Sequence, residues 1–337
     1  MTTLAVRDLV KDYALRSGLR RSTLRAVDRV SFTLEPGRTV ALVGESGSGK
    51  STVARMIARL EKPSAGRITV TAPDGRPVPD RHYRHHVQMV FQDPFGSLNP
   101  FHTVEHHLAR PLRLHGRARN REEARALVEE LLERVNLGPA RTIARRRPHE
   151  LSGGQRQRVA IARALAPGAT VVIADEPVSM LDVSIRLGIL NLLARLQRED
   201  TLAVLYITHD LATARHFSDD ILVMYRGRVV ERGPADEVIL RPRHPYTRLL
   251  ASAAPDPGAR GRSPEAAVVT GAAGERYAAG AGSGCDFRGR CPRATDACSR
   301  VPEDAEVGYD HYAKCWHPLA ATTGPDTAAD SGERRAG

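Results

Sequence analysis

Short runs of apolar residues, rich in Val and Ile, recur along the first two thirds of the chain. Each run is bounded by polar or turn residues, which is the pattern of strands buried on both faces of a sheet. The sequence predicts such strands at residues 39–43, 87–91, 171–174 and 202–207. Helical periodicity fills several of the gaps between them. The pattern therefore predicts an α/β domain with a mainly parallel sheet.

Other patterns predict strands at both ends of this domain and helices in its middle. Near the start of the chain, apolar and polar residues alternate as in strands, and the turn Glu35-Pro36-Gly37 ends this pattern. Later, two predicted strands on either side of the turn Arg226-Gly227 would form a terminal hairpin. The predicted strands are 4–10, 26–34, 221–225 and 229–231, and the predicted amphipathic helices are 122–135 and 155–165.

The composition changes after about residue 250. Residues 251–284 are dominated by Ala, Gly, Pro and Arg, which is typical of a flexible linker. All four cysteines follow this segment, and the tail after Pro318 is predicted to be disordered. We expect a main domain with a helical subdomain, a linker, a cysteine module and a tail, at residues 1–250, about 95–165, 251–284, 285–318 and 319–337.

The charge leaves several partners open. Fifty Lys and Arg against 39 Asp and Glu give a net charge of +11, which suits nucleic acid, anionic lipid or nucleotide phosphates. Arg-rich clusters at 16–25 and 141–147 are more often solvated faces than binding grooves. No run approaches the roughly 20 apolar residues of a membrane helix, and residues 1–15 lack the apolar core of a signal peptide. We expect a cytosolic chain that other proteins hold at any membrane it serves.

A glycine-rich loop follows the predicted strand 39–43 and precedes a predicted helix. Its sequence, Gly-Glu-Ser-Gly-Ser-Gly-Lys-Ser, matches the phosphate-binding pattern G-x-x-x-x-G-K-[ST] in that context. Its glycines let the backbone turn N–H groups inward, and the lysine can reach the β- and γ-phosphates. We expect the nucleotide to be bound by Gly44, Glu45, Ser46, Gly47, Ser48, Gly49, Lys50, Ser51 and Thr52.

Two acidic residues end the predicted strand 171–174. Asp175 would hold Mg²⁺ together with the Ser51 hydroxyl, and Glu176 would act as the general base for the water that attacks the γ-phosphate. Adjacent acids at a strand end could instead cap a helix, but the phosphate-binding loop favours the catalytic interpretation.

Further motifs occur in the order found in one family. Leu151-Ser-Gly-Gly-Gln155 matches the ABC signature, Gln92 occupies the Q-loop position, Ser179-Met-Leu-Asp182 resembles the D-loop, and His209 resembles the switch histidine. From Met1 to about Leu250 the chain resembles an ABC-type nucleotide-binding subunit. The resemblance implies a P-loop NTPase fold with a helical subdomain, to which this chain adds a small cysteine-containing extension.

The resemblance also implies a site shared between two chains. Ser152, Gly153, Gly154 and Gln155 would bind the γ-phosphate of ATP that the opposite subunit holds. A serine hydroxyl and backbone N–H groups at a helix N-terminus suit such an anion. ATP would then join two subunits head to tail, and hydrolysis would release them.

The family's remaining roles map onto single residues. Gln92 would contact Mg²⁺ and the attacking water, His209 the γ-phosphate, and Asp182 would couple the two sites across the dimer. Tyr13 would stack on adenine. Met180 departs from the smaller residue of many relatives, with little expected effect. Since none of the catalytic positions is degenerate, we expect a hydrolytically competent ATPase.

Longer stretches resemble one branch of the family, the oligopeptide and dipeptide importers. These stretches are residues 91–100, 176–184, 244–250 and 284–316. The resemblance implies peptide import at the cytoplasmic face of the membrane, with a second ATP-binding subunit of the same or another sequence, two permease subunits and an extracytoplasmic substrate-binding protein. Residues 95–100 would receive a helix of the membrane subunit.

The alternative function is an ABC-class ATPase acting on nucleic acid or in translation. About a hundred residues separate Lys50 from Ser152, which leaves no room for the long coiled coil of the repair and chromosome types. The chain has one phosphate-binding loop and one signature, whereas the translation types usually have two of each. We therefore expect no nucleic-acid partner.

The cysteines form a separate candidate site. Cys285, Cys291, Cys298 and Cys315, with His311 and His317 nearby, suggest a metal or iron–sulfur site because a cytosolic protein rarely keeps disulfides. Their spacing lacks the C-x-x-C pairs of common zinc knuckles, and four thiolates suit a [4Fe–4S] cluster, which the importer resemblance also implies. Zinc and free buried thiols are the alternatives. We expect a structural rather than a redox role.

Overall fold

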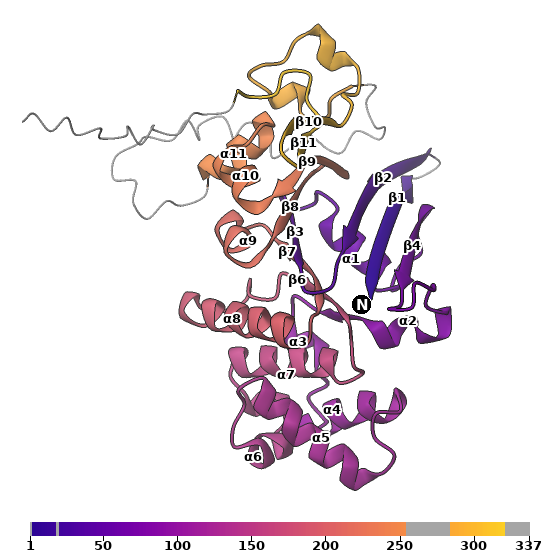
Figure 1. The fold of residues 1–337 in the computed structure, drawn as a ribbon, viewed down its shortest axis with the longest axis vertical. Coiled ribbons are helices and arrows are strands. Elements are labelled where there is room, and N and C mark those ends of the chain that lie inside the picture. Colours follow the sequence, from indigo (N-terminus) through magenta and orange to yellow (C-terminus); the bar gives the residue numbers. More distant parts are fainter. Residues whose placement is uncertain (1, 18–19, 254–283, 321–337) are drawn as a thin grey trace, which may run out of the picture.

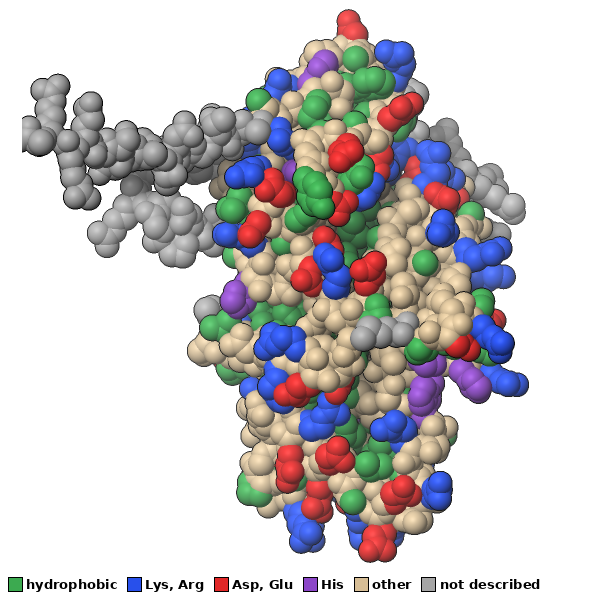
Figure 2. All heavy atoms as spheres, in the orientation of Figure 1, with side chains coloured by type: hydrophobic (Ala, Val, Ile, Leu, Met, Phe, Trp, Pro, Cys, Tyr) green, Lys and Arg blue, Asp and Glu red, His purple; other side chains and the backbone are tan. Residues whose placement is uncertain are grey.

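A computed structural model of the chain describes residues 2–17, 20–253 and 284–320 (Figure 1). Most of the predicted linker, at 254–283, and the predicted disordered tail, at 321–337, lie outside the described residues. The molecule is elongated, with the sheets and the cysteine module in one half and a group of helices in the other. On the face drawn in Figure 2, basic and acidic side chains are interspersed over both halves.

The main sheet has eight strands in the order β10-β11-β9-β8-β3-β7-β6-β5. The five strands from β8 to β5 run parallel, and the other three pair antiparallel. The strands are β3 (Thr39–Val43), β5 (Val87–Val90), β6 (Val171–Asp175), β7 (Ala203–Thr208), β8 (Asp220–Tyr225), β9 (Arg228–Pro234), β10 (Ala305–Gly308) and β11 (His311–Ala313). Every residue of β3, β6 and β7 is buried, which explains their continuous apolar runs.

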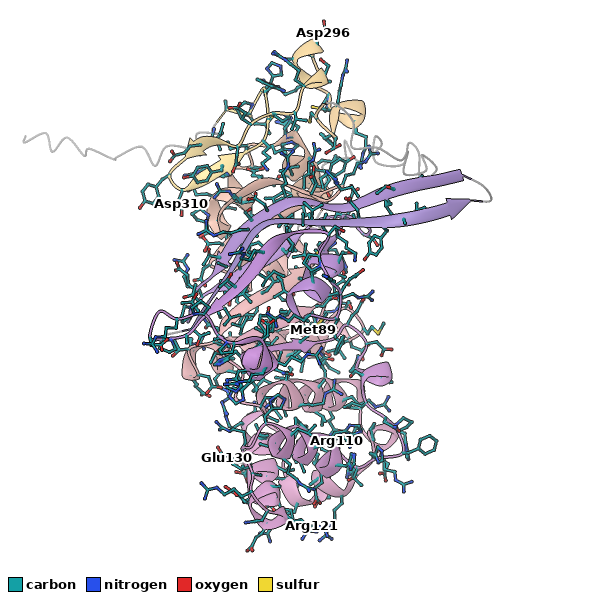
Figure 3. All side chains as sticks on the ribbon, turned by 90° about the vertical axis from the view of Figure 1, so that its right-hand side faces the viewer. Met89, Arg110, Arg121, Glu130, Asp296 and Asp310 are labelled. Carbon is teal, nitrogen blue, oxygen red and sulfur yellow. The ribbon has the colours of Figure 1, made fainter. Side chains whose placement is uncertain are left out.

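A second sheet of three antiparallel strands lies beside the first, in the order β2-β1-β4. It contains β1 (Thr3–Ser17), β2 (Arg20–Leu34) and β4 (Ala65–Thr71). The first two are longer than the predicted 4–10 and 26–34, and they project as a hairpin to one side (Figure 3). Only Val70 of β4 is buried, so this strand lacks the apolar run that would have predicted it.

Two hydrophobic cores cover the two faces of the main sheet. Successive side chains of a strand point to opposite faces, so Ile173 joins one core while Val172 and Ala174 join the other. The first core is shared with the small sheet, α1 (Lys50–Ile57) and α2 (Asp80–His86). The second is shared with α4 (Val104–Leu114), α5 (Arg121–Arg134), α6 (Ala140–Arg145), α7 (Gly153–Leu165), α8 (Val183–Glu199), α9 (Leu211–Phe217), α10 (Ala235–Leu240) and α11 (Pro245–Ala253).

The helices α3 (Pro94–Ser97) to α7 form the half of the molecule opposite the cysteine module. The predicted helices 122–135 and 155–165 coincide with α5 and α7. Asn120 caps α5 by accepting a hydrogen bond from the Glu123 N–H, and Thr103 caps α4 in the same way. These caps fix where each helix begins.

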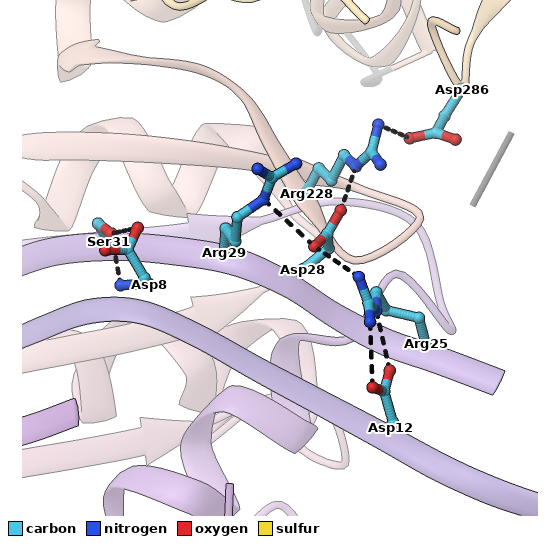
Figure 4. Close-up of polar contacts among 8 residues, drawn as sticks. All are labelled: Asp8, Asp12, Arg25, Asp28, Arg29, Ser31, Arg228 and Asp286. Atoms are coloured by element: carbon cyan, nitrogen blue, oxygen red, sulfur yellow. Dashed lines mark hydrogen bonds and ion pairs between the residues drawn. The ribbon is translucent and has the colours of Figure 1, made fainter. Parts of the chain in front are cut away.

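The cysteine module extends the main sheet. The predicted hairpin is formed by β8 and β9, but it is not terminal, because β11 pairs antiparallel with β9 through Tyr312 and Ala313. Arg228 of β9 adds a side-chain link, since its guanidinium pairs with Asp28 of β2 at 2.7 Å and with Asp286 of the module at 3.2 Å (Figure 4). The module is therefore part of the folded domain.

A buried carboxylate anchors this junction. Glu231, 1% exposed on β9, accepts hydrogen bonds from the backbone N–H groups of Arg243 and His244, and lies 2.7 Å from the Nε2 of buried His311. Burial lowers the pKa of His244 to about 4, so this imidazole is neutral, and its Nδ1 accepts from the Tyr246 N–H. One acidic side chain thus joins β9, the segment leading into α11, and β11.

We expect Glu231→Ala to destabilise the protein by about 3 kcal/mol, because it leaves one buried N–H group, one partly buried N–H group and a buried imidazole without their acceptor. The midpoint of urea unfolding, followed by circular dichroism, measures the change. The matched control is Asp304→Asn, which breaks the half-exposed pair between the same module and Arg232. Asp304→Asn should lower the free energy of unfolding by less than about 1 kcal/mol. Equal effects of the two changes would refute the anchoring role of Glu231.

Candidate nucleotide-binding site

The carboxyl ends of three strands meet at one edge of the main sheet. Val43, at the end of β3, pairs with Thr208 of β7, and Asp175, at the end of β6, pairs with Ile207. The residues that follow these ends, in the phosphate-binding loop (residues 44–51), at 176 and at 209, therefore come together. A parallel sheet places ligand sites at this edge.

The phosphate-binding loop is held between two stretches of backbone. Gly49 has φ of 103°, and a Cβ placed there would lie 2.4 Å from the Ala26 carbonyl oxygen. At Gly44, a Cβ would lie 2.2 Å from the Met224 carbonyl oxygen. Gly49 is also the N-cap of α1, and having no side chain it leaves the first N–H groups of the helix to a bound anion.

Lys50 is buried against this loop. Its Nζ donates to the carbonyl oxygens of Gly44 at 2.8 Å and Glu45 at 2.9 Å. Burial lowers the pKa of Lys50, and the charges of Glu176, Asp175 and Glu45 oppose that effect. The ammonium is thus positioned where a nucleotide phosphate would meet both the loop and the acidic residues.

Ser51 and Asp175 form the candidate magnesium site. The Ser51 hydroxyl donates to Asp175 Oδ1 at 3.2 Å, and Asp175 is 6% exposed. Burial raises the pKa of Asp175, while the Ser51 hydrogen bond lowers it. A hydroxyl and a carboxylate are oxygen ligands of the kind that Mg²⁺ uses beside phosphates, so these donors fit the ion.

Glu176 lies between two polar side chains from other strands. Gln92 Nε2 donates to Glu176 Oε2 at 3.0 Å, and His209 Nδ1 lies 3.4 Å from Oε1. The Glu176 N–H donates to Ile207, and the residue adopts a left-handed φ of 44°, a costly conformation that occurs at functional sites. The structure therefore brings together all three residues predicted to be catalytic.

The D-loop begins beside these groups. The Ser179 hydroxyl donates to the Glu176 carbonyl oxygen at 3.0 Å and lies 3.5 Å from Gln92 Nε2. Met180 is 54% exposed, and Asp182 is the exposed N-cap of α8. An exposed Asp182 can contact a second subunit, as the family resemblance implies.

The signature residues lie at the start of α7. Ser152 Oγ accepts from the Gln155 N–H, and the Gln155 side chain accepts from the Ser152 N–H, so the two form a capping box. Gly154 packs against α8, where an added Cβ would lie 2.7 Å from Ile185. The helix lies at a different level from α1 along the long axis of the molecule (Figure 1). The four predicted signature residues, Ser152, Gly153, Gly154 and Gln155, are thus not gathered at the phosphate-binding loop of the same chain.

Tyr13 lies in β1 next to the helix that follows the phosphate-binding loop. Burial raises the pKa of Tyr13, with the nearby Glu61 adding to the effect and Thr52 of α1 opposing it. Lys11 Nζ lies 4.9 Å from the centre of the ring. This position beside α1 is compatible with the predicted contact to adenine.

Two residues near the loop were not predicted from the sequence. The Glu45 N–H donates to the Tyr246 hydroxyl at 3.0 Å, and the Glu45 carboxylate pairs with Arg290 of the cysteine module. About two hundred residues separate these partners from Glu45 in the chain, and no pattern in the sequence links them.

The four thiols of the cysteine module are free and close to one another. Cys298 is buried and the other three are half-buried. Burial raises the pKa of Cys315 to about 11, and the charges of Cys285, Cys291 and Cys298 add to this effect. Within the described residues, however, no group of three or more His, Cys, Asp or Glu side chains is arranged to hold a metal ion. The geometry thus gives the predicted iron–sulfur or zinc site no support.

The two histidines of that candidate site have other partners. His311 pairs with Glu231, and His317 Nε2 lies 2.7 Å from the Thr295 hydroxyl. Neither is therefore free to join the thiols in the conformation described.

A cleft of about 880 Å³ connects the candidate magnesium site with the helical half of the molecule. Ser51, Gln92 and Asp175 line one part of it, and His102 and Leu114 line another. Phe101, which follows residues 95–100, is 82% exposed.

The chain is similar in sequence to known ATP-binding proteins of transporters. Residues 27–179 match the family model of the ABC transporter, and residues 230–298 match that of the oligopeptide/dipeptide transporter C-terminal region. The chain is 43% identical to a di/tripeptide transport ATP-binding protein DppF of Pseudomonas aeruginosa over 308 residues, covering 90% of this chain and 94% of that protein. It is also 43% identical to the oligopeptide transport ATP-binding protein AppF of Bacillus subtilis, covering 93% and 97%.

A solved structure shows the same fold. The dimeric ATP-binding cassette MJ0796, in a post-hydrolysis state bound to ADP and Pi, is 32% identical to this chain with a TM-score of 0.58. The similarity covers 69% of this chain and 98% of that one.

We expect Gly49→Ala to weaken ATP binding by about tenfold or more, because the new Cβ meets the Ala26 carbonyl at a left-handed φ and must distort the loop. Equilibrium titration with ATP and Mg²⁺ measures the affinity. Gly75→Ala is the control, since Gly75 has φ of 79° but no atom within 4 Å of an added Cβ. It should lower stability by about 1 kcal/mol and leave ATP affinity unchanged. Unchanged affinity in Gly49→Ala would contradict the role of the loop.

Proposed function

The chain belongs to the family of ABC transporter ATP-binding subunits, and from this membership and the site geometry we infer that it hydrolyses ATP to drive the import of peptides. The observation that carries the proposal is the cluster of Gln92, Glu176 and His209 beside the phosphate-binding loop. The match of residues 230–298 to the oligopeptide/dipeptide transporter C-terminal region supports peptides as the cargo.

Each side chain of the candidate site would have its own role in ATP hydrolysis. The loop N–H groups and Lys50 bind the phosphates, and Ser51 and Asp175 would hold the Mg²⁺ ion, which neutralises phosphate charge. Glu176 accepts the proton of the attacking water as general base. Gln92 and His209 hold the Glu176 carboxylate from both sides, so that it is oriented before the water attacks.

The complete site requires a second subunit. Ser152 and Gly154 lie at the start of α7, at a different level from α1, so they would face the γ-phosphate of ATP bound to the partner. The dimeric state of the MJ0796 cassette supports this arrangement. Asp182, exposed at the start of α8, lies where it can couple the two sites.

Membrane-spanning partners complete the transporter. Among the described residues, none of the helices has the length and apolar character to cross a bilayer. The cleft between the magnesium site and the helical half, with Phe101 and Leu114 exposed beside it, suits an amphipathic helix of a permease subunit. Movement of that helix would reach Gln92 directly. The chain would therefore act at the cytoplasmic face of the membrane, with two permease subunits and, through them, an extracytoplasmic substrate-binding protein.

The nucleic-acid alternative has less support. The two relatives described above are named for peptide transport. Basic side chains on the face in Figure 2 are interspersed with acidic ones. Several arginines of the described residues are paired with acidic side chains, such as Arg141 with Glu129. A nucleic-acid groove would instead need a continuous basic surface.

We expect Glu176→Gln to lower ATP turnover by about 10²- to 10⁴-fold, because the amide cannot accept the proton of the attacking water. ATP and Mg²⁺ should still bind, so the variant should accumulate as an ATP-bound dimer in size-exclusion chromatography. Glu199→Gln, which changes an exposed carboxylate at the end of α8, is the control and should turn over ATP like the wild type.

Turnover by Glu176→Gln at the wild-type rate would refute the general-base role. If wild type binds ATP but neither protein dimerises alone, a different ATP-binding subunit is the partner, and mixing candidate partners with this chain should restore the dimer.

We also infer that the four thiols bind a [4Fe–4S] cluster with a structural role. The proposal rests on the close grouping of Cys285, Cys291, Cys298 and Cys315 in the module. Four thiolates are the usual ligands of such a cluster, which would cross-link a module containing only short helices and strands. Because the side chains are not arranged as a metal site, the thiols would have to reorient to bind it.

Protein purified without oxygen should then contain about four iron and four acid-labile sulfide atoms per chain. Cys298→Ser should lose most of both, because it removes one ligand, whereas Ser299→Ala should keep them. Zinc in place of iron, or no metal with four titratable thiols after unfolding, would refute the cluster.

A further inference from the structure

Several polar contacts join the cysteine module to the rest of the chain, and one of them reaches the phosphate-binding loop. Arg228 pairs with Asp286, and Arg232 pairs with Asp304, but neither pair includes a residue of the loop. Arg290, by contrast, pairs with Glu45, the second residue of the loop. This contact connects the module directly with the part of the chain that binds nucleotide phosphates.

The pair between Arg290 and Glu45 has a forked geometry. Nη1 lies 3.1 Å from Oε2 and Nη2 lies 3.0 Å from Oε1, so two hydrogen bonds fix the carboxylate in one orientation. The Arg290 side chain is 28% exposed and the Glu45 side chain 38%. Solvent therefore screens the attraction between their charges less than it would at a fully exposed pair.

Aromatic packing fixes the position of Arg290. Phe287, three residues earlier, is 2% exposed and contacts Tyr225 and Tyr246 with ring centres 5.4 and 5.5 Å apart. The Tyr246 hydroxyl in turn accepts the Glu45 N–H. Both the backbone and the side chain of Glu45 are therefore held by residues from the C-terminal part of the chain.

The charge of Glu45 matters to the nucleotide site. Its carboxylate is close enough to Lys50 to influence the ammonium, together with Asp175 and Glu176. A negative charge at that position also repels the phosphates that Lys50 and the loop would bind. The guanidinium of Arg290 opposes this repulsion and holds the carboxylate on the side of the module.

We propose that Arg290 is a positioning residue for ATP binding: by pairing with Glu45 it neutralises and orients the carboxylate at the loop, so that the cysteine module sets the affinity of the site for ATP. The proposal rests on the proposed function, since it concerns the same nucleotide site. It predicts opposite effects of removing the two partners, because Glu45 carries the charge that repels phosphate and Arg290 neutralises that charge.

Full-length Arg290→Gln should bind ATP about three- to tenfold more weakly in the presence of Mg²⁺, and its KM should rise by the same factor with kcat changed less than about twofold. Glu45→Gln should bind ATP more tightly than wild type, since it removes the negative charge that repels the phosphates. In the Glu45→Gln background, adding Arg290→Gln should cost less affinity than it does in wild type. Equilibrium titration with ATP at two salt concentrations measures all three, and higher salt should reduce the differences.

The matched control is Arg232→Gln. It removes the ion pair between Arg232 of β9 and Asp304 of the module, which includes no residue of the loop. Its ATP affinity should equal that of wild type. Arg290→Lys, which keeps the charge but not the fork, should restore part of the lost affinity.

Three outcomes would overturn the proposal: wild-type affinity in Arg290→Gln, an equal loss in Arg232→Gln, or an undiminished loss from Arg290→Gln when Glu45 is already Gln. An equal loss in Arg232→Gln would mean that the module affects ATP binding only by stabilising the fold as a whole. Failure of the proposed function is distinct, because wild-type protein would then bind no ATP at all.

Discussion

The parallel pairing of β3, β7 and β6 determines where the phosphate-binding loop, Asp175, Glu176 and His209 lie, and so where most of the candidate nucleotide site forms. The three strands end at the same edge because Val43 pairs with Thr208 and Asp175 with Ile207. Residues that are more than a hundred positions apart in the chain therefore meet within hydrogen-bond distance, as Ser51 and Asp175 do. A shift of one residue in this register would also exchange the side chains of the two hydrophobic cores, so the fold and the site depend on the same pairing.

Much of the fold, and most of the residues that the structure brings together at the candidate site, could be predicted from the sequence. Strands β3, β6 and β7 were evident because burial on both faces leaves continuous apolar runs, and the loop at 44–51 and the acids at 175 and 176 follow these strands at motif spacing. Strand β4 was not predicted because it is largely exposed, and β10 and β11 because each is too short to show a pattern.

The contacts that the sequence did not reveal depend on tertiary structure alone. The docking of β11 on β9 uses backbone hydrogen bonds, which any residue can make, so it leaves no signature in the residue types. Arg290 and Tyr246 reach Glu45 only because the cysteine module and α11 lie beside the loop. For the four cysteines, the spacing in the sequence predicts that the thiols lie in one module, but it does not fix whether their side chains form a metal site.

The pairing of β11 with β9 also protects the protein from self-association. Without β11, β9 would be the last strand of the main sheet and would present unpaired N–H and C=O groups to other molecules. An open edge of that kind can recruit the same strand from a second copy, and growth of such contacts leads to aggregation rather than to a defined dimer. A chain that lacked the segment containing β11 would carry this open edge, so the C-terminal segment also covers a strand that could otherwise pair with another molecule.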